Sequence, residues 1–210
     1  CGNTYAHHWR HKVKTDCILE YTPMTPWHKA WQNQFDDSCR EIVHFDEITK
    51  EKHVADIKTQ NGIIVELQHS AISIEERVSR EKFYKNMIWI IDGRKYYEKF
   101  KKIKYKQINQ YQFICLNPNE GFPSEWLNCS VPIYFDYLGL DNHLNENFFI
   151  FELTKRNNQI LITKILIKTF IQEIKNAKAI IPNNINYYVI PQTNKQNKKN
   201  VIRKNRPYMY

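Results

Sequence analysis

Four polar side chains that could hold a metal ion or position a phosphate lie close together in residues 52–70, KHVADIKTQNGIIVELQHS. Apolar and polar residues alternate on either side of an Asn-Gly pair, which predicts the two strands of a hairpin. Asp56 and Lys58 fall on the polar face of the first strand, and Glu66 and Gln68 fall on that of the second. Carboxylates, an ammonium group and an amide are groups that bind divalent cations and stabilise phosphoryl oxygens.

The register of this hairpin decides whether the two acids meet. A two-residue turn would place residues of opposite parity across from each other, so one strand would turn its apolar face to water. We therefore predict a three-residue connection, Gln60-Asn61-Gly62, with Gly62 in the left-handed conformation as a bulge. This register puts Asp56 opposite Glu66.

Two facing carboxylates repel each other unless a cation neutralises them. Mg²⁺ commonly takes one or two protein carboxylates and keeps water and substrate phosphate as its other ligands. The sequence thus predicts Asp56 and Glu66 as ligands of Mg²⁺ or Mn²⁺, with Lys58 or Gln68 holding the attacking water or the phosphate. The alternative is a solvated strand face with ordinary charges.

A helix is predicted after the hairpin, because Ser73 and Glu76 have the spacing of a capping box. Arg77, Arg80 and Tyr84 recur along one side of it at spacings of three and four. A basic and aromatic stripe beside an acidic pair suits the backbone of a nucleic acid, so these three residues are the predicted contacts. A solvated helix face is the alternative.

Elements on both sides place this hairpin in an α/β order. Thr25 and Pro26 have the residue types that begin a helix, and Trp27, Trp31 and Phe35 would form its apolar side. Strands are predicted in the apolar runs 39–45, 87–93, 106–117 and 131–140, and a second long helix in 163–177. From the first helix onward the order is helix, strand, strand, strand, helix, strand.

Residues 95–107, KYYEKFKKIKYKQ, are strongly basic with interleaved tyrosines. This pattern is typical of nucleic-acid backbone contact and base stacking, and equally of an edge strand that lysines protect from aggregation. Residues 183–210 form a basic tail, with disorder and an arm over phosphates as the two interpretations.

The composition sets the broad class. With 210 residues, of which 42% are hydrophobic, the chain can bury a core in one domain. The formal charge of +9 favours a nucleic-acid partner, with a merely basic protein as the alternative. Five scattered cysteines fit free thiols, and no apolar run reaches the length of a membrane span, so we expect a cytoplasmic protein without a membrane partner. G-x-S-x-G and phosphate-loop motifs are absent, which argues against a serine hydrolase or a motor ATPase.

Residues 51–93, EKHVADIKTQNGIIVELQHSAISIEERVSREKFYKNMIWIIDG, resemble the nuclease domain of the competence protein CoiA-like family, within the PD-(D/E)XK nuclease superfamily. The likeness extends to TPWHKAWQNQF, CREIVHF, HHWRH and VPIYFD, and so spans residues 7–140. It implies a restriction-endonuclease-like αβββαβ core with a mixed central sheet. It also implies metal-dependent cleavage of nucleic acid, with DNA as the expected substrate.

The resemblance assigns roles residue by residue. Asp56 matches the acid of the second core strand, and Glu66 matches the acid of the E-x-K element. Gln68 stands where the superfamily most often has lysine, although glutamine is usual in this family. Because glutamine cannot carry a proton, either it orients water or Lys58 supplies the ammonium group.

Three further roles follow from the resemblance. The superfamily often has another carboxylate near the first helix, and Glu20 and Glu41 are the candidates; we prefer Glu41 as a metal ligand, because it lies on the strand beside the hairpin. His28 is expected to contact the metal site or the phosphate. His53 precedes Asp56 by three residues, so it is expected to be a buried, hydrogen-bonded histidine.

The first residues offer a different metal site. Cys1, His8, His11 and Cys17 could bind structural Zn²⁺ through two sulfurs and two imidazoles, and relatives often begin with a zinc-ribbon-like segment. The spacing is irregular and no C-x-x-C is present, so a polar leader anchored by Trp9 is the alternative.

Together these inferences predict a Mg²⁺-dependent deoxyribonuclease with an α/β fold. We expect a His-rich leader at 1–22, the nuclease-like core at 23–140, a C-terminal helical addition at 141–182 and the basic tail at 183–210. The alternative function is a non-cleaving DNA-binding protein of competence or recombination with the same fold.

Overall fold

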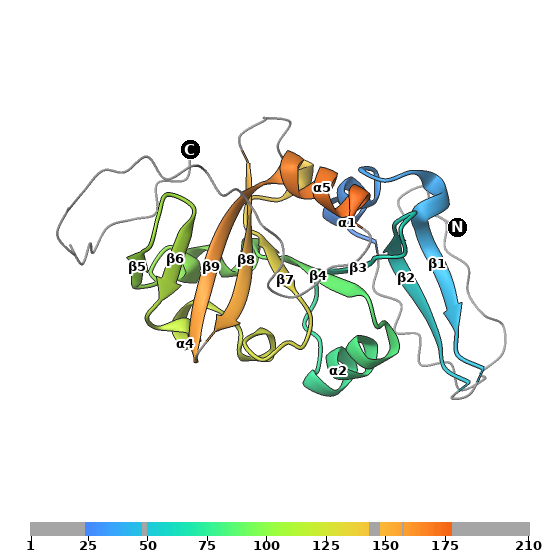
Figure 1. Cartoon of the computed structure of the whole chain (residues 1–210), viewed down its shortest axis with the longest axis horizontal. Helices are drawn as coiled ribbons and strands as arrows, with labels where there is room; N and C mark the ends of the chain where they lie inside the picture. The colour runs from blue at the N-terminus through green and yellow to red at the C-terminus, as the bar shows by residue number, and fades with distance from the viewer. Residues whose placement is uncertain (1–23, 48–49, 143–147, 157, 178–210) are drawn as a thin grey trace, which may run out of the picture.

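A computed structural model describes residues 24–47, 50–142, 148–156 and 158–177. Within them, one mixed sheet has nine strands in the order β1-β2-β3-β4-β7-β8-β9-β6-β5, and β1 and β5 lie at opposite ends of the molecule (Figure 1). The strands are β1 (Arg40–Phe45), β2 (Lys52–Lys58), β3 (Ile64–Gln68), β4 (Met87–Asp92), β5 (Tyr105–Gln107), β6 (Gln112–Cys115), β7 (Ile133–Asp136), β8 (Phe149–Arg156) and β9 (Gln159–Leu166). The α-helices are α1 (Pro26–Gln32), α2 (Ile74–Phe83), α3 (Tyr97–Phe100), α4 (Pro118–Gly121) and α5 (Ile167–Asn176). Short 3-10 helices are η1 (Asp37–Cys39), η2 (Arg94–Tyr96), η3 (Ser124–Trp126) and η4 (Leu140–Asn142).

The first half of the fold follows the predicted order. From α1 to β4 the elements run helix, strand, strand, strand, helix, strand, apart from the short η1. β1, β2 and β3 are antiparallel neighbours, whereas β3, β4 and β7 are parallel. Every residue of β4 is buried, as its continuous apolar run predicts for a central strand. The predicted α/β class with a mixed sheet is confirmed.

The C-terminal part differs from the prediction of a helical addition at 141–182. This range contains β8 and β9 before α5 begins at Ile167. β8 pairs with β7 and β9 pairs with β6, so both strands lie inside the sheet. The long helix predicted from residue 163 starts four residues later, because the β-branched residues before it continue β9. The expected boundary at residue 140 therefore divides one continuous sheet.

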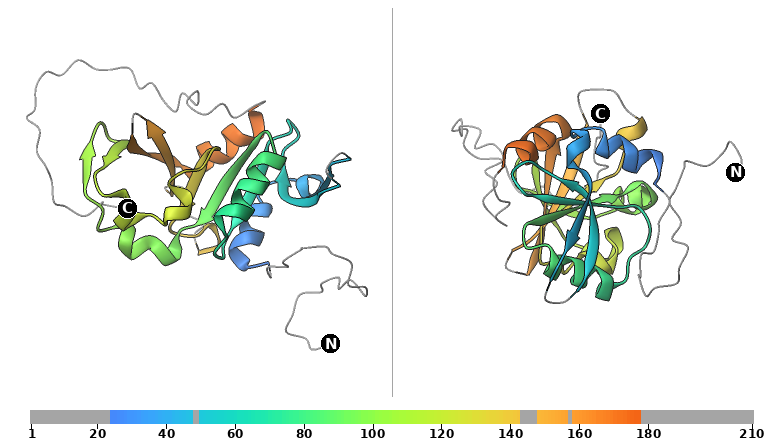
Figure 2. Two further views of the ribbon diagram at one scale, coloured as in Figure 1. Left: turned by 90° about the horizontal axis from the view of Figure 1, so that it is seen from below. Right: turned by 90° about the vertical axis from the view of Figure 1, so that its right-hand side faces the viewer.

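Two apolar cores lie on the two faces of the sheet. α1 and α5 cover one face, and α2 lies on the other (Figure 2). Trp27 and Trp31 of α1 are fully buried with Phe170 of α5, as the predicted apolar side of the first helix requires. Tyr84, which follows α2, belongs to the opposite core together with Phe100 of α3.

A buried carboxylate fixes α1 to the sheet. Asp136, at the end of β7, is 2% exposed and accepts hydrogen bonds from Nε1 of Trp27 at 2.9 Å and Nε1 of Trp31 at 3.1 Å. It also accepts from the backbone N–H groups of residues 138–140, at 3.2, 2.8 and 3.0 Å. Asp136 thus accepts hydrogen bonds from five N–H groups, and two of these bonds position α1, the helix that carries His28.

We expect Asp136→Ala to lower the free energy of unfolding by about 3–5 kcal/mol, because it leaves buried indole and backbone N–H groups without an acceptor. Urea denaturation would measure this change. The matched control is Asp37→Ala, since that side chain is 93% exposed and its one ion pair within the described residues is with Arg40; its expected change is below about 1 kcal/mol. Equal changes in the two variants would contradict the anchoring role.

Candidate functional site

The hairpin β2–β3 has the predicted three-residue connection. Ile57 lies across from Val65, so residues of equal parity face each other. The N–H of Thr59 donates to the carbonyl oxygen of Ile63 at 2.9 Å and closes the loop. Gly62 has a φ of 85°, the left-handed conformation predicted for the bulge. Both predictions about this turn are confirmed.

The two strands separate where the acids meet. Their ladder ends at Ile57 and Val65, and beyond it the N–H of Leu67 donates to Oδ2 of Asp56 at 2.7 Å. A carboxylate therefore takes the place of a backbone carbonyl. Extended by one residue, this register would place Asp56 across from Glu66, and the two side chains are close enough for the charge of Asp56 to raise the pKa of Glu66. The β1–β2 ribbon diverges from β3 and β4 (Figure 1).

Each of the two carboxylates uses one oxygen to bind the scaffold. Oε2 of Glu66 accepts from Nη1 of Arg80 at 2.7 Å, while Oε1 is buried and has no hydrogen-bond partner in the described part of the chain. Oδ2 of Asp56 accepts a hydrogen bond from the N–H of Leu67, and its Oδ1 lies 3.2 Å from Nε2 of His28. Oε1 of Glu66 is therefore the carboxylate oxygen without a partner here, and His28 lies beside the other acid.

Burial and the neighbouring Asp56 raise the pKa of Glu66 to about 8, although Arg80 acts in the opposite direction. Glu66 is 1% exposed, so water does little to stabilise its charge. In the absence of a cation, this carboxyl group therefore holds a proton at neutral pH.

Unpartnered polar atoms concentrate around the acidic pair. Among the described residues, six buried side-chain N or O atoms have no hydrogen-bond partner, and four of them are Nε2 of His28, Nε2 of His44, Oε1 of Glu66 and Oη of Tyr84. The ring of Tyr84 meets that of His44 edge-on, with centroids 5.3 Å apart. Burial and the charge of Glu66 raise the pKa of Tyr84, so its hydroxyl group keeps its proton. Buried polar atoms without partners are uncommon in folded proteins, so this concentration marks the acidic pair as the candidate site.

His44 is a site residue that the sequence reasoning missed. It lies on β1 across from His53 of β2. Burial and the nearby Lys58 lower the pKa of His44, so its imidazole is neutral at pH 7. The available signal was the alternation in β1, which turns Ile42 and His44 to the less exposed side. His53, expected to be buried, is half-buried, and its ring lies 4.5 Å from that of Phe83 between centroids.

The predicted basic stripe on α2 divides into two roles. Arg80 is partly exposed and pairs with Glu66 and, at 2.8 Å, with Glu76. Arg77 is 3% exposed and forms a buried ion pair with Glu81. The structure thus gives Arg77 no route to a phosphate, and we remove it from the predicted contacts. Tyr84 is also buried and contributes to the wall of the site rather than to an outer surface.

The other residues predicted for the site do not gather around Asp56 and Glu66 as a single cluster. Lys58 is half-buried. Gln68 donates its amide to the carbonyl oxygen of Ser70 at 3.1 Å. Glu41 occupies the position on β1 across from Asp56, but it is exposed and has a φ of 51°. No three His, Cys, Asp or Glu side chains gather around a common centre in the described residues, so Glu41 does not complete a three-ligand site.

The predicted zinc ligands Cys1, His8, His11 and Cys17 lie outside the described residues.

A second polar cluster follows the same edge of the sheet. Asp92, at the end of β4, is 3% exposed and accepts from Nε of Arg94 at 2.8 Å. Its Oδ2 lies 2.7 Å from Nδ1 of His69. Burial alone would raise the pKa of Asp92, but the bonds from Arg94 and His69 hold it below its ordinary value. An ionised Asp92 can only accept hydrogen bonds, so Nδ1 of His69 must carry the proton that it donates to this carboxylate.

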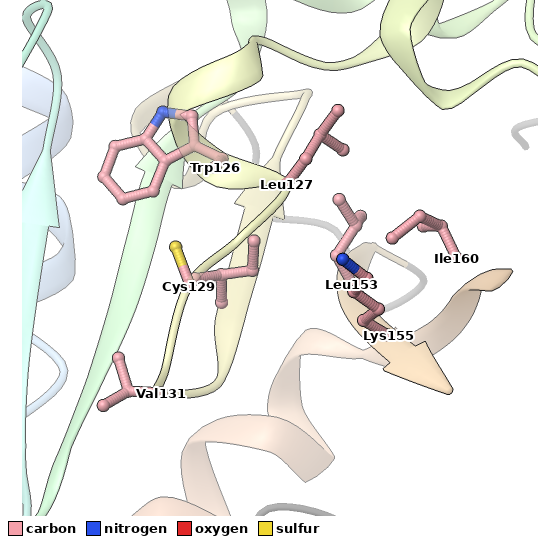
Figure 3. A pocket seen from close by; sticks show the side chains of 8 residues that line it. Trp126, Leu127, Cys129, Val131, Leu153, Lys155 and Ile160 are labelled. Carbon is pink, nitrogen blue, oxygen red and sulfur yellow. The ribbon is translucent and has the colours of Figure 1, made fainter. Parts of the chain in front are cut away.

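An apolar hollow lies elsewhere and does not join the acidic pair (Figure 3). Its volume of about 30 Å³ is enough for a water-sized molecule. Burial raises the pKa of Cys129, one of its lining residues, to about 12, so the thiol is not nucleophilic at neutral pH. The hollow is lined by Trp126, Leu127, Cys129, Val131, Ile133, Leu153, Lys155 and Ile160.

No family model, curated protein or solved structure matches this chain. The resemblance to CoiA-like nucleases therefore stays a prediction that depends on the quoted residues. In the described segments, no helix has the length and apolar character needed to span a membrane.

The raised pKa of Glu66 predicts how stability depends on pH. The folded protein holds a proton on Glu66 up to pH 8 or so, whereas the unfolded chain releases it above about 4.5. The free energy of unfolding should therefore fall as pH rises through this window, and Glu66→Gln should lack that loss. We expect the stability of Glu66→Gln relative to the wild type to increase from pH 6 to pH 9, measured by urea denaturation in EDTA. A pH-independent difference would refute the assigned protonation.

Proposed function

We propose that this chain is a metal-dependent nuclease that hydrolyses phosphodiester bonds of DNA at the pair Asp56 and Glu66. The observation that carries the proposal is the buried Oε1 of Glu66, which has no hydrogen-bond partner among the described residues although the charge of Asp56 is close to this carboxyl group. A structural acid at this position would have its oxygens satisfied. The order of elements from α1 to β4 is also the order that the resemblance implies.

The donors suit a hard divalent cation. Oε1 of Glu66 and Oδ1 of Asp56 are carboxylate oxygens, and Mg²⁺ or Mn²⁺ held by one or two carboxylates keeps positions for water and phosphate. His28, 3.2 Å from Asp56, lies beside these donors. When bound, such a cation polarises a phosphoryl oxygen and lowers the pKa of a coordinated water.

The chain's own residues would bind the phosphate and orient the water. The ammonium group of half-buried Lys58 is a donor for the oxygens of the scissile phosphate, and the buried, protonated hydroxyl of Tyr84 is a donor for a group bound inside the site. Gln68 has committed its amide nitrogen to Ser70, so its carbonyl oxygen is the group that can orient water. Arg80 holds Glu66 in place and supplies a positive charge next to the substrate.

The first test of this function is cleavage of a duplex oligonucleotide in Mg²⁺ or Mn²⁺. We expect Asp56→Asn and Glu66→Gln to reduce the single-turnover rate by at least about 100-fold, because each removes a charged ligand of the cation. Both variants should also lose Mn²⁺ binding in calorimetry. Glu75→Gln is the matched control, since Glu75 is exposed in the first turn of α2, and it should cut at the wild-type rate.

Cutting that survives both substitutions would refute the assigned site. DNA binding in EDTA without cleavage in either metal would instead favour the alternative function, a DNA-binding protein that does not cut.

A second test separates Lys58 from Gln68. We expect Lys58→Met to slow cleavage by roughly 100-fold, because it removes a charged donor to the phosphate. Gln68→Met should cost only about tenfold, since the amide nitrogen already bonds Ser70. Single-turnover rates at saturating metal would measure both effects. The reverse ranking would assign the main role to Gln68.

A further inference from the structure

Residues 94–106, which follow β4, are the most basic part of the described chain. They carry seven cationic side chains and one acidic side chain, Glu98. That acid is already paired, with its Oε1 2.5 Å from Nζ of Lys101. The segment therefore contributes six of the chain's net nine positive charges.

Five lysines of this segment are exposed and have no acidic partner among the described residues. Lys95 is bound to a neutral carbonyl oxygen, that of His69, at 3.4 Å. Lys99 and Lys102 have no side-chain partner at all in the described part of the molecule. The five exposed residues are Lys95, Lys99, Lys102, Lys104 and Lys106. So many uncompensated charges repel one another and favour a polyanion.

The basic segment and the acidic pair lie on the same side of the sheet. Phe100 and Ile103 anchor the segment in the core that also contains Tyr84, the wall of the acidic site. Its first turn is tied to the end of β3 through the contact between Asp92 and His69. The segment and the wall of the acidic site are therefore parts of the same face of the sheet.

The segment offers positive charge rather than surfaces for base stacking. Nζ of Lys95 lies 4.9 Å from the ring centre of Tyr96, and Nζ of Lys101 lies 4.7 Å from that of Tyr97. These tyrosines are half-buried, with the ammonium groups over their rings. Contact with phosphates therefore fits better than stacking of unpaired bases. β5 is an edge strand, so its single lysine, Lys106, also fits the predicted protection against aggregation.

We propose that the exposed lysines between η2 and β5, above all Lys99 and Lys102, bind the sugar–phosphate backbone of duplex DNA on the face of the sheet that also carries Tyr84. This inference depends on the proposed function for its link to cleavage, but not for binding itself. The partner is recognised by charge, so binding is expected to be independent of sequence and strongly weakened by salt.

The test uses the variant Lys99→Gln/Lys102→Gln and a fluorescent 30-base-pair duplex in EDTA at several salt concentrations. Each lost phosphate contact lowers the slope of log K against log salt by about 0.9, so we expect a decrease of roughly 2 and an affinity loss of at least about tenfold at low salt. The matched control is Lys168→Gln/Lys175→Gln on α5, which removes two exposed charges from the opposite face. Its slope should stay close to that of the wild type.

An unchanged slope in the first variant, or equal losses in both, would overturn the inference. Preferential binding to phosphatidylserine vesicles, abolished by the same substitutions, would overturn it in favour of a membrane surface. Because metal is absent, the result does not depend on cleavage. If the lysine variant shows the lower salt slope but the wild-type protein does not cleave DNA in any metal, the proposed nuclease function would be refuted while the DNA-binding surface would be supported.

Discussion

The hydrogen bond from the Leu67 N–H to the Asp56 carboxylate is the constraint on which the candidate site depends. A side chain in this position replaces the carbonyl that would otherwise extend the ladder between β2 and β3. The strands therefore separate, and the second oxygen of Asp56 remains near His28. Glu66 lies buried next to a like charge, which is why the pKa of Glu66 is raised to about 8.

Local rules were enough to predict the hairpin and its neighbours. Burial of alternate residues allows only one parity of pairing, so the three-residue connection and the left-handed Gly62 followed from the sequence. The Thr25 cap and the Ser73 cap, which accept backbone bonds at 3.2 and 3.1 Å, likewise begin α1 and α2 where predicted. These features are determined within a few residues. They could therefore be predicted without knowing what packs against them.

The errors arose where distant packing decides the outcome. Short apolar runs fit a buried helix and a buried strand almost equally, so residues 163–166, the last four of β9, were assigned to the helix that follows. Arg77 has the spacing of an exposed stripe, but Glu81 beside it and the carbonyl of Asn128 attract its guanidinium into the protein. His44 joins the site only because β1 pairs with β2 and brings it to Tyr84. None of these contacts is visible in local spacing.

Three neighbouring parallel strands, β3, β4 and β7, each bury one acidic side chain. The hydrogen-bond partners of these three acids differ, and the difference separates acids with a structural role from one available to a ligand. Asp136 accepts five hydrogen bonds, and Asp92 accepts from Arg94 and meets His69, so protein groups satisfy both of these carboxylates. Glu66 has Arg80 on one oxygen and no hydrogen bond from the described residues on the other. A fold that satisfies two buried acids so fully can satisfy a third. The unsatisfied oxygen of Glu66, close to the like charge of Asp56, is therefore the feature on which the proposed cation site depends.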